Sequence, residues 1–189
     1  MKQNTRMTTL GLALAGVMVA LVMISNYISI PTAFSRLHVA NAVCMLAGMM
    51  FGGLRGGIIA GLGSALFDLT FPAYAPEAWV TFLTKGLMTL VAGLFVNHRK
   101  NAPVKMPTLL IGSFLGVITY IVLYLSKSYI QMRWVVPVPV ETIPAALLGK
   151  LSSSAINGLF AIIVAPLLYS ALMPGLKAAG LTEALKPNK

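Results

Sequence analysis

Long apolar segments, separated by short polar or proline-containing ones, make up most of this chain. An α-helix needs about 20 apolar residues to cross a ~30 Å hydrocarbon layer, and four segments approach or exceed that length. The second and third segments contain only 13 residues each, so tilt or local thinning must help them to span. The pattern predicts an all-α polytopic membrane protein with six transmembrane helices in a single membrane domain, 1–189. We expect the helices over residues 8–28, 39–51, 57–69, 79–96, 107–125 and 143–172.

Prolines and polar clusters mark the connections between these helices. We expect a short loop over 31–36, a proline-containing loop over 71–79 and a basic turn over 98–105. The longest loop is predicted over 127–141, where the Val-Pro-Val-Pro-Val run favours an extended backbone. The last helix is expected to continue past Pro166.

Composition agrees with a membrane protein, because 58% of the residues are hydrophobic, only 10% are charged and the mean hydropathy is +0.86. A soluble domain of this size cannot bury so much apolar surface. Lys2 and Arg6 before an apolar run resemble a signal peptide, but the succession of further spans favours an uncleaved first helix. Cys44 is the only cysteine, so neither a disulfide framework nor a cysteine-based metal site is expected.

The net charge of +10 follows the positive-inside rule and does not indicate a nucleic-acid partner. With both termini in the cytoplasm, nine basic residues lie inside and three outside. The three on the outside are Arg36, Lys127 and Arg133. The nine on the inside are Lys2, Arg6, Arg55, Arg99, Lys100, Lys105, Lys177, Lys186 and Lys189.

A glycine-rich stretch, 51–68, forms a tight turn at Arg55 and then two rows of small residues at helical spacing. Such rows allow another helix to approach closely, although they are also common as plain packing surfaces. One row is Gly57, Gly61 and Ala65; the other is Gly56, Ala60, Ser64 and Asp68. Because the second row becomes more polar along the helix, Asp68 is expected to point into the bundle.

Charged residues within the spans are costly and commonly mark function. Lys85 shares a helix face with Thr81 and Thr89. Lys150, Ser153, Ser154 and Asn157 share a face of the last helix. In the predicted topology Asp68, Lys85 and Lys150 lie at similar depth in the outward half, and Asn41 could join them. The excess of positive charge suits a small ligand with an anionic or acceptor-bearing group.

Structural alternatives remain for each of these residues. Lys85 and Lys150 could extend to the membrane surface, or Asp68 and Lys85 could form an ion pair that only joins helices. Asn157 could bond a neighbouring helix. Four residues of the outward loops and helix ends could cover the site or, for the aromatic ones, belong to the interfacial belt. They are Tyr74, Trp79, Arg133 and Trp134.

Small residues on the first helix offer a flat contact surface, either for packing within the bundle or for docking another subunit. They are Gly11, Ala15, Gly16 and Ala20. Known catalytic patterns are missing: there is no phosphate-binding loop, and His38 and His98 lie on opposite sides of the membrane, without metal-ligand spacing. A pairing of His38 with Asp68 leaves an intramembrane hydrolase as an outside candidate.

Three parts of the chain stand out together: the stretch Met-Phe-Gly-Gly-Leu-Arg-Gly-Gly-Ile-Ile-Ala-Gly-Leu-Gly-Ser-Ala-Leu-Phe-Asp, the Ala-Tyr-Ala-Pro loop and Thr84-Lys85-Gly86. They resemble the substrate-binding S components of energy-coupling factor (ECF) vitamin transporters, riboflavin-type branch. The resemblance covers about residues 8–172. It implies a non-catalytic, multi-pass subunit of the bacterial plasma membrane that captures a vitamin from outside. A transmembrane coupling subunit and two ATPase subunits would use ATP to drive release inside. No covalently bound cofactor is implied.

The resemblance also implies that the first-helix surface docks the coupling subunit and that outward loops and helices four to six form the pocket, which agrees with Lys85, Lys150 and Asn157. It does not select the vitamin: riboflavin, cobalamin, pyridoxine or a pyrimidine precursor, and pantothenate stay open. A membrane-embedded enzyme and a small self-sufficient channel or transporter are the alternatives, although the inward half of the chain carries few polar residues that could line a channel.

Overall fold

The chain folds as an all-helical protein in this computed structural model, which describes residues 8–31, 36–98 and 104–185. The helices are α1 (Thr9–Tyr27), α2 (Ala40–Phe51), α3 (Gly53–Leu69), α4 (Ala78–Val96), α5 (Met106–Ile130), α6 (Ile143–Ala178) and the short α7 (Thr182–Leu185). Each of the six predicted helical ranges overlaps one of the helices α1 to α6. Helix α3 begins at Gly53, so Arg55 lies within it and not in the predicted turn.

Among the described residues, four helical segments are long and apolar enough to cross a membrane. They are Thr9–Tyr27, Ala75–Val96, Met106–Val135 and Val140–Ala178. Ala40–Phe51 is a shorter apolar helix, and α3 has 17 residues. The helical character of the membrane domain is thus established, and the number of six crossings stays a prediction.

The prediction of a long loop over 127–141 is wrong. Helix α5 continues to Ile130, a π-helical turn follows over Gln131–Val135, and a 3₁₀ turn covers Val140–Thr142 before α6. The reason is local: proline disrupts a helix, and the first proline after Pro107 is Pro137. Extended backbone is therefore limited to the few residues around Pro137 and Pro139.

Smaller differences occur at other connections. Residues on either side of 32–35 form an antiparallel hairpin of β1 (Ser29–Pro31) and β2 (Arg36–His38), with Ser29 opposite His38. The 71–79 loop contains a 3₁₀ turn, Ala75–Glu77. Helix α6 runs through Pro166 as expected, but it also passes Pro174 and ends at Ala178.

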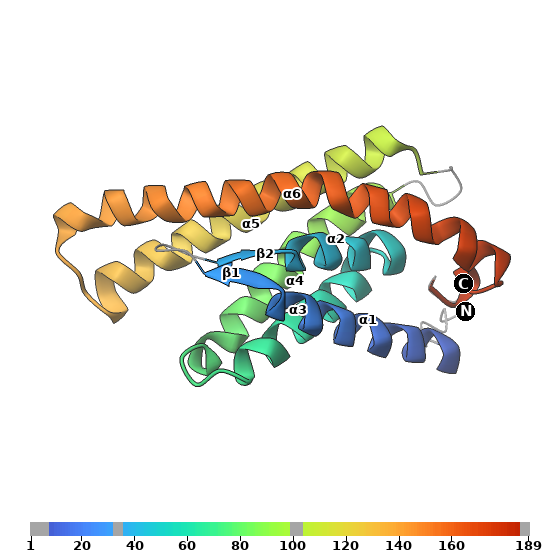
Figure 1. Ribbon diagram of the computed structural model, residues 1–189, viewed down its shortest axis with the longest axis horizontal. Helices are drawn as coiled ribbons and strands as arrows, with labels where there is room; N and C mark the ends of the chain where they lie inside the picture. Colours follow the sequence, from blue (N-terminus) through green and yellow to red (C-terminus); the bar gives the residue numbers. More distant parts are fainter. Residues whose placement is uncertain (1–7, 32–35, 99–103, 186–189) are drawn as a thin grey trace, which may run out of the picture.

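Helices α5 and α6 form a long pair that runs across the shorter helices α1 to α4 (Figure 1). The start of α1 and the short α7 lie together at one end of the molecule, on the same side as the α2–α3 connection, the end of α4 and the start of α5. The β1–β2 hairpin and the connections α3–α4 and α5–α6 lie toward the other end. We call this second end the outer end, following the predicted topology. Six of the basic residues counted for that topology lie outside the described residues: Lys2, Arg6, Arg99, Lys100, Lys186 and Lys189.

Both predicted rows of small residues on α3 make close helix contacts, which confirms their expected role. A Cβ atom on Gly57 would lie 2.8 Å from the Gly86 carbonyl oxygen of α4. A Cβ atom on Gly56 would lie 2.4 Å from the Gly48 Cα atom of α2. Because backbone atoms cannot rotate away as side chains do, only glycine allows these approaches. Helix α3 is therefore packed tightly against two neighbours at once.

Gly56→Ala is expected to destabilise the protein by about 1–3 kcal/mol, since the added methyl group forces α2 and α3 apart. The matched control is Gly16→Ala, where a Cβ atom meets nothing within 4 Å. Thermal unfolding in detergent, followed by circular dichroism, checks both variants. Equal melting temperatures for Gly56→Ala and the parent would contradict this packing.

Single cysteines on a Cys44→Ala background test the orientation. Glu141 lies at the outer end, whereas Lys177 lies near the C-terminal end of α6, and both are exposed. With positive charge inside, a membrane-impermeant maleimide should label Glu141→Cys in intact cells and Lys177→Cys only after permeabilisation. The reverse labelling pattern would invert the predicted topology.

Candidate ligand-binding site

The buried ammonium of Lys85 joins three helices. Lys85 lies in the middle of α4 with only 5% of its surface exposed, and its Nζ donates a hydrogen bond to Asn41 Oδ1 at the start of α2. The same nitrogen lies 4.6 Å from the centroid of the Tyr120 ring of α5, a cation–π contact. The side chain therefore points to the interior of the bundle, in agreement with a site residue and not with one that extends to the membrane surface.

Two buried hydrogen-bonding groups near Lys85 have no hydrogen-bond partner of their own within the described residues. Asn41 is 1% exposed, and its Nδ2 has no hydrogen-bond partner within the described residues. The same holds for the Thr89 hydroxyl, one turn along α4 from Lys85 and fully buried. Buried polar groups are normally paired, since an unmade hydrogen bond costs about 1–3 kcal/mol. Asn41 and Thr89 thus keep unused hydrogen-bonding capacity beside Lys85.

Two stacked tyrosines continue the site along α5. The Tyr120 and Tyr124 ring centroids are 5.6 Å apart, with 10° between the ring planes. Lys150 Nζ of α6 lies 5.4 Å from the Tyr124 centroid, so each ring carries one lysine. The structure therefore brings both predicted lysines to one aromatic surface. Sequence reasoning missed the tyrosines, although their spacing of four residues opposite two intramembrane lysines was the available signal.

Asp68 belongs to this region but does not pair directly with Lys85. The half-buried carboxylate lies near the Thr81 side chain and interacts with Lys85 only over a longer distance. No salt bridge joins Asp68 to Lys85 within the described residues, whereas one joins Lys127 to Glu77, so the alternative of an Asp68–Lys85 ion pair is wrong. The neutral Asn41 oxygen takes the place that a carboxylate would occupy.

Asn157 of α6 has a structural contact. Its Oδ1 accepts a hydrogen bond of 3.0 Å from the backbone nitrogen of His38 in β2, and the side chain is 5% exposed. The amide therefore attaches the β1–β2 hairpin to α6, which agrees with the alternative that it bonds a neighbouring element. Ser153 and Ser154, on the same face, are also buried.

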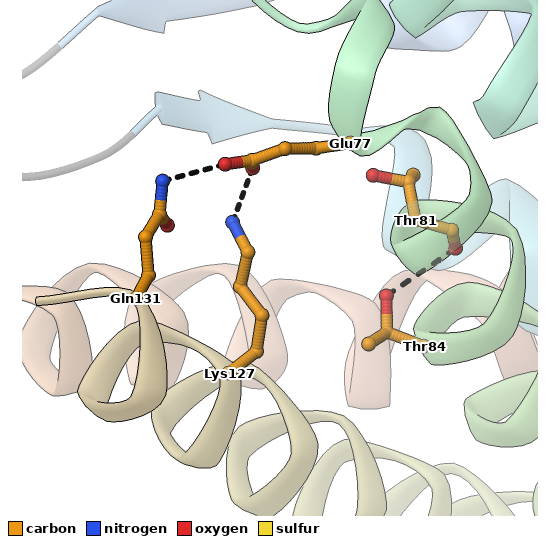
Figure 2. A network of polar contacts seen from close by, with 5 residues as sticks. All are labelled: Glu77, Thr81, Thr84, Lys127 and Gln131. Carbon is orange, nitrogen blue, oxygen red and sulfur yellow. Dashed lines mark hydrogen bonds and ion pairs between the residues drawn. The ribbon is translucent and has the colours of Figure 1, made fainter. Parts of the chain in front are cut away.

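A second polar cluster lies at the outer end of α4 and α5. The Glu77 carboxylate pairs with Lys127, and its other oxygen accepts a hydrogen bond of 2.6 Å from Gln131 Nε2 (Figure 2). Thr84, further along α4, donates to the Thr81 carbonyl oxygen. Sequence reasoning did not identify the Glu77 cluster, because it placed Lys127 and Gln131 in a loop.

The structure does not bring the predicted covering residues together over the lysines. Trp79 and Trp134 are 66% and 64% exposed, as expected for an interfacial belt. Tyr74 is exposed beside Phe71, with ring centroids 5.9 Å apart. Arg133 lines a separate hollow of about 230 Å³ between the end of α5 and the start of α6.

The small residues of α1 divide into two faces. Gly11 and Ala15 are buried, and a Cβ atom on Gly11 would lie 2.5 Å from the Ala184 carbonyl oxygen of α7. This half of the row packs within the protein's own bundle. Gly16 and Ala20 are exposed and remain accessible to another subunit.

Known proteins share both the sequence pattern and the fold. The family model described as "ECF-type riboflavin transporter, S component" matches residues 6–174. A relative from Pyrococcus woesei, named "Uncharacterized protein in gap 3'region", is 32% identical over 103 residues, which are 54% of this chain and 66% of the relative.

The fold is also similar to that of solved structures. One described as "Structure and mechanism of the S component of a bacterial ECF transporter" superposes with a TM-score of 0.64 and 21% identity, over 88% of this chain and 97% of that one. A FolT structure bound with folic acid gives a TM-score of 0.49 and 22% identity, over 81% and 98%. Because the family model matches most of its length, the chain belongs to the family of S components of ECF-type riboflavin transporters.

Proposed function

We propose that this S component binds a flat, acceptor-bearing vitamin between α2, α4, α5 and α6 and takes it up from the outer face of a bacterial plasma membrane. The observation that carries the proposal is the inward-pointing Lys85. An ammonium group has three hydrogen-bond donors, and Asn41 Oδ1 receives one of them. With the unpaired Asn41 Nδ2, the remaining donors favour a ligand rich in acceptors.

The tyrosine pair supports a planar ring as the other part of the ligand. Aromatic rings favour offset-stacked or edge contacts, and Tyr120 and Tyr124 offer adjacent rings with nearly parallel planes. Among the vitamins considered, riboflavin combines a flat ring system with several acceptors, and pantothenate has no ring. Riboflavin is therefore the first ligand to test, in agreement with the description of the matching family.

Transport would need partners. We propose a transmembrane coupling subunit and two ATPase subunits, since no phosphate-binding loop occurs in this sequence. The exposed face of α1 that includes Gly16 and Ala20 would meet the coupling subunit, because small residues permit close helix contact. Gly11 and Ala15 would support that face from within.

Mass spectrometry of the purified protein should identify a co-purified vitamin, and calorimetric titration with riboflavin should give a defined affinity. Lys85→Met and Lys150→Met should each weaken riboflavin binding at least tenfold, about 1.4 kcal/mol, by removing a donor beside the tyrosines. The control is Lys105→Met, which changes an exposed lysine at the cytoplasmic end. If both variants bound as tightly as the parent, the proposed site would be wrong.

Uptake and binding should separate when the partners are removed. Cells that express this chain with a coupling subunit and ATPases should accumulate labelled riboflavin, and cells without the ATPases should not. Membranes from both should bind riboflavin equally, because binding needs only the S component. Accumulation against a gradient without ATPases would contradict the proposed division of labour.

A further inference from the structure

One face of α5 connects the tyrosine pair with the outer end. Tyr120, Tyr124, Lys127 and Gln131 follow one another at spacings of four, three and four residues, so all four share that face. The first two contact the lysines of the candidate site, and the last two contact Glu77. A molecule that moves along this face from the outer end toward Lys85 must therefore pass the Glu77 cluster.

Glu77 uses both carboxylate oxygens to hold this end of α5. One oxygen pairs with Lys127, and the other accepts from Gln131, one helical turn further on (Figure 2). Glu77 itself lies in the 3₁₀ turn directly before α4. The cluster thus joins the 3₁₀ turn before α4 to the end of α5 and the start of the π-helical turn. The side chains of Lys127 and Glu77 are 25% and 35% exposed, so water and salt can reach the pair.

Helix α5 changes from α-helical to π-helical geometry at Gln131, the residue that contacts Glu77. Gln131 is the C-cap of α5 and the first residue of the π-helical turn Gln131–Val135. Single π-helical turns are uncommon in proteins, and those that occur are often found at functional sites. Beyond this point the chain carries the exposed Trp134, Val135 and Val136, without buried residues in the turn itself. Glu77 therefore fixes α5 at the boundary between its packed part and its exposed end.

We propose that Glu77 is a positioning residue that holds α5 through Lys127 and Gln131 and so controls access from the outer face to the tyrosine–lysine site. The proposal rests on the proposed ligand site. In the held state the ends of α4 and α5 lie together beside the tyrosines. When the two contacts of Glu77 break, the end of α5 moves away from α4, and the path to Lys85 opens.

Cys44 is a natural reporter for this opening. It is the only cysteine of the chain, lies fully buried on α2, one turn after Asn41, and belongs to the same buried cluster as Tyr120. A thiol in that position reacts with a water-soluble reagent only when the interior becomes accessible. Its reaction rate with methanethiosulfonate ethylammonium therefore measures opening without any vitamin.

A charge-reversal cycle tests the proposal in detergent-solubilised protein. Glu77→Lys and Lys127→Glu each place like charges together and should raise the Cys44 reaction rate at least tenfold. The double variant Glu77→Lys/Lys127→Glu should return to within about twofold of the parent, because the ion pair is rebuilt and the Gln131 amide can donate or accept. Glu141→Gln, which changes an exposed acid at the same end, is the matched control and should leave the rate unchanged.

Lys127→Met provides a second route if a charge reversal prevents folding. It should raise the Cys44 rate several-fold, and added KCl should accelerate the parent but not this variant, since salt screens an exposed ion pair. Single variants with rates within twofold of the parent, or a double variant as fast as the singles, would overturn the proposal. A purely structural role would lower the melting temperature of the single variants and leave their Cys44 rates within twofold of the parent. If only the proposed ligand site were wrong, Lys85→Met would bind riboflavin as tightly as the parent, while the Cys44 rates would still change as described.

Discussion

An ammonium group inside a membrane bundle must find oxygen or aromatic partners there, and this requirement organises the centre of the protein. Lys85 obtains one partner from α2 and one from α5. Neither partner carries a full negative charge, so the positive charge is held in place without being cancelled. The arrangement leaves an electrostatic attraction for a guest molecule, which a lysine–carboxylate pair at the same position would largely remove.

The close packing of small residues makes this centre possible. Glycines on α3 let α2 and α4 approach its backbone, and α4 carries Lys85 toward Asn41. Methionines fill the remaining space, with Met45, Met49 and Met88 fully buried. Because methionine side chains are flexible and polarisable, they can adapt to irregular gaps. The interior thus combines close backbone contacts with adaptable side chains.

Apolar periodicity and charge predicted the helices, the glycine contacts and the interior lysines, since each follows from local sequence and from the cost of charge in lipid. The tyrosine pair was not predicted, because tyrosine is common in membrane helices and only the fold shows that Tyr120 faces Lys85. Asn157 was assigned to ligand, whereas the hairpin that receives it forms from residues distant in sequence. The end of α5 was predicted too early, because the prolines at 137 and 139 were expected to end the helix about ten residues before them, whereas helical backbone continues to Val135.

The unequal helix lengths have a consequence for the surrounding lipid. Helix α6 has 36 residues, about 54 Å at 1.5 Å per residue, whereas α2 has 12 residues, about 18 Å. No bilayer of uniform thickness matches both lengths, so if α2 crosses as predicted, the longer helix must lean while the lipid thins around the shorter one. Every ångström of mismatch adds a fraction of a kcal/mol, and the resting inclination of the protein is therefore set partly by acyl-chain length.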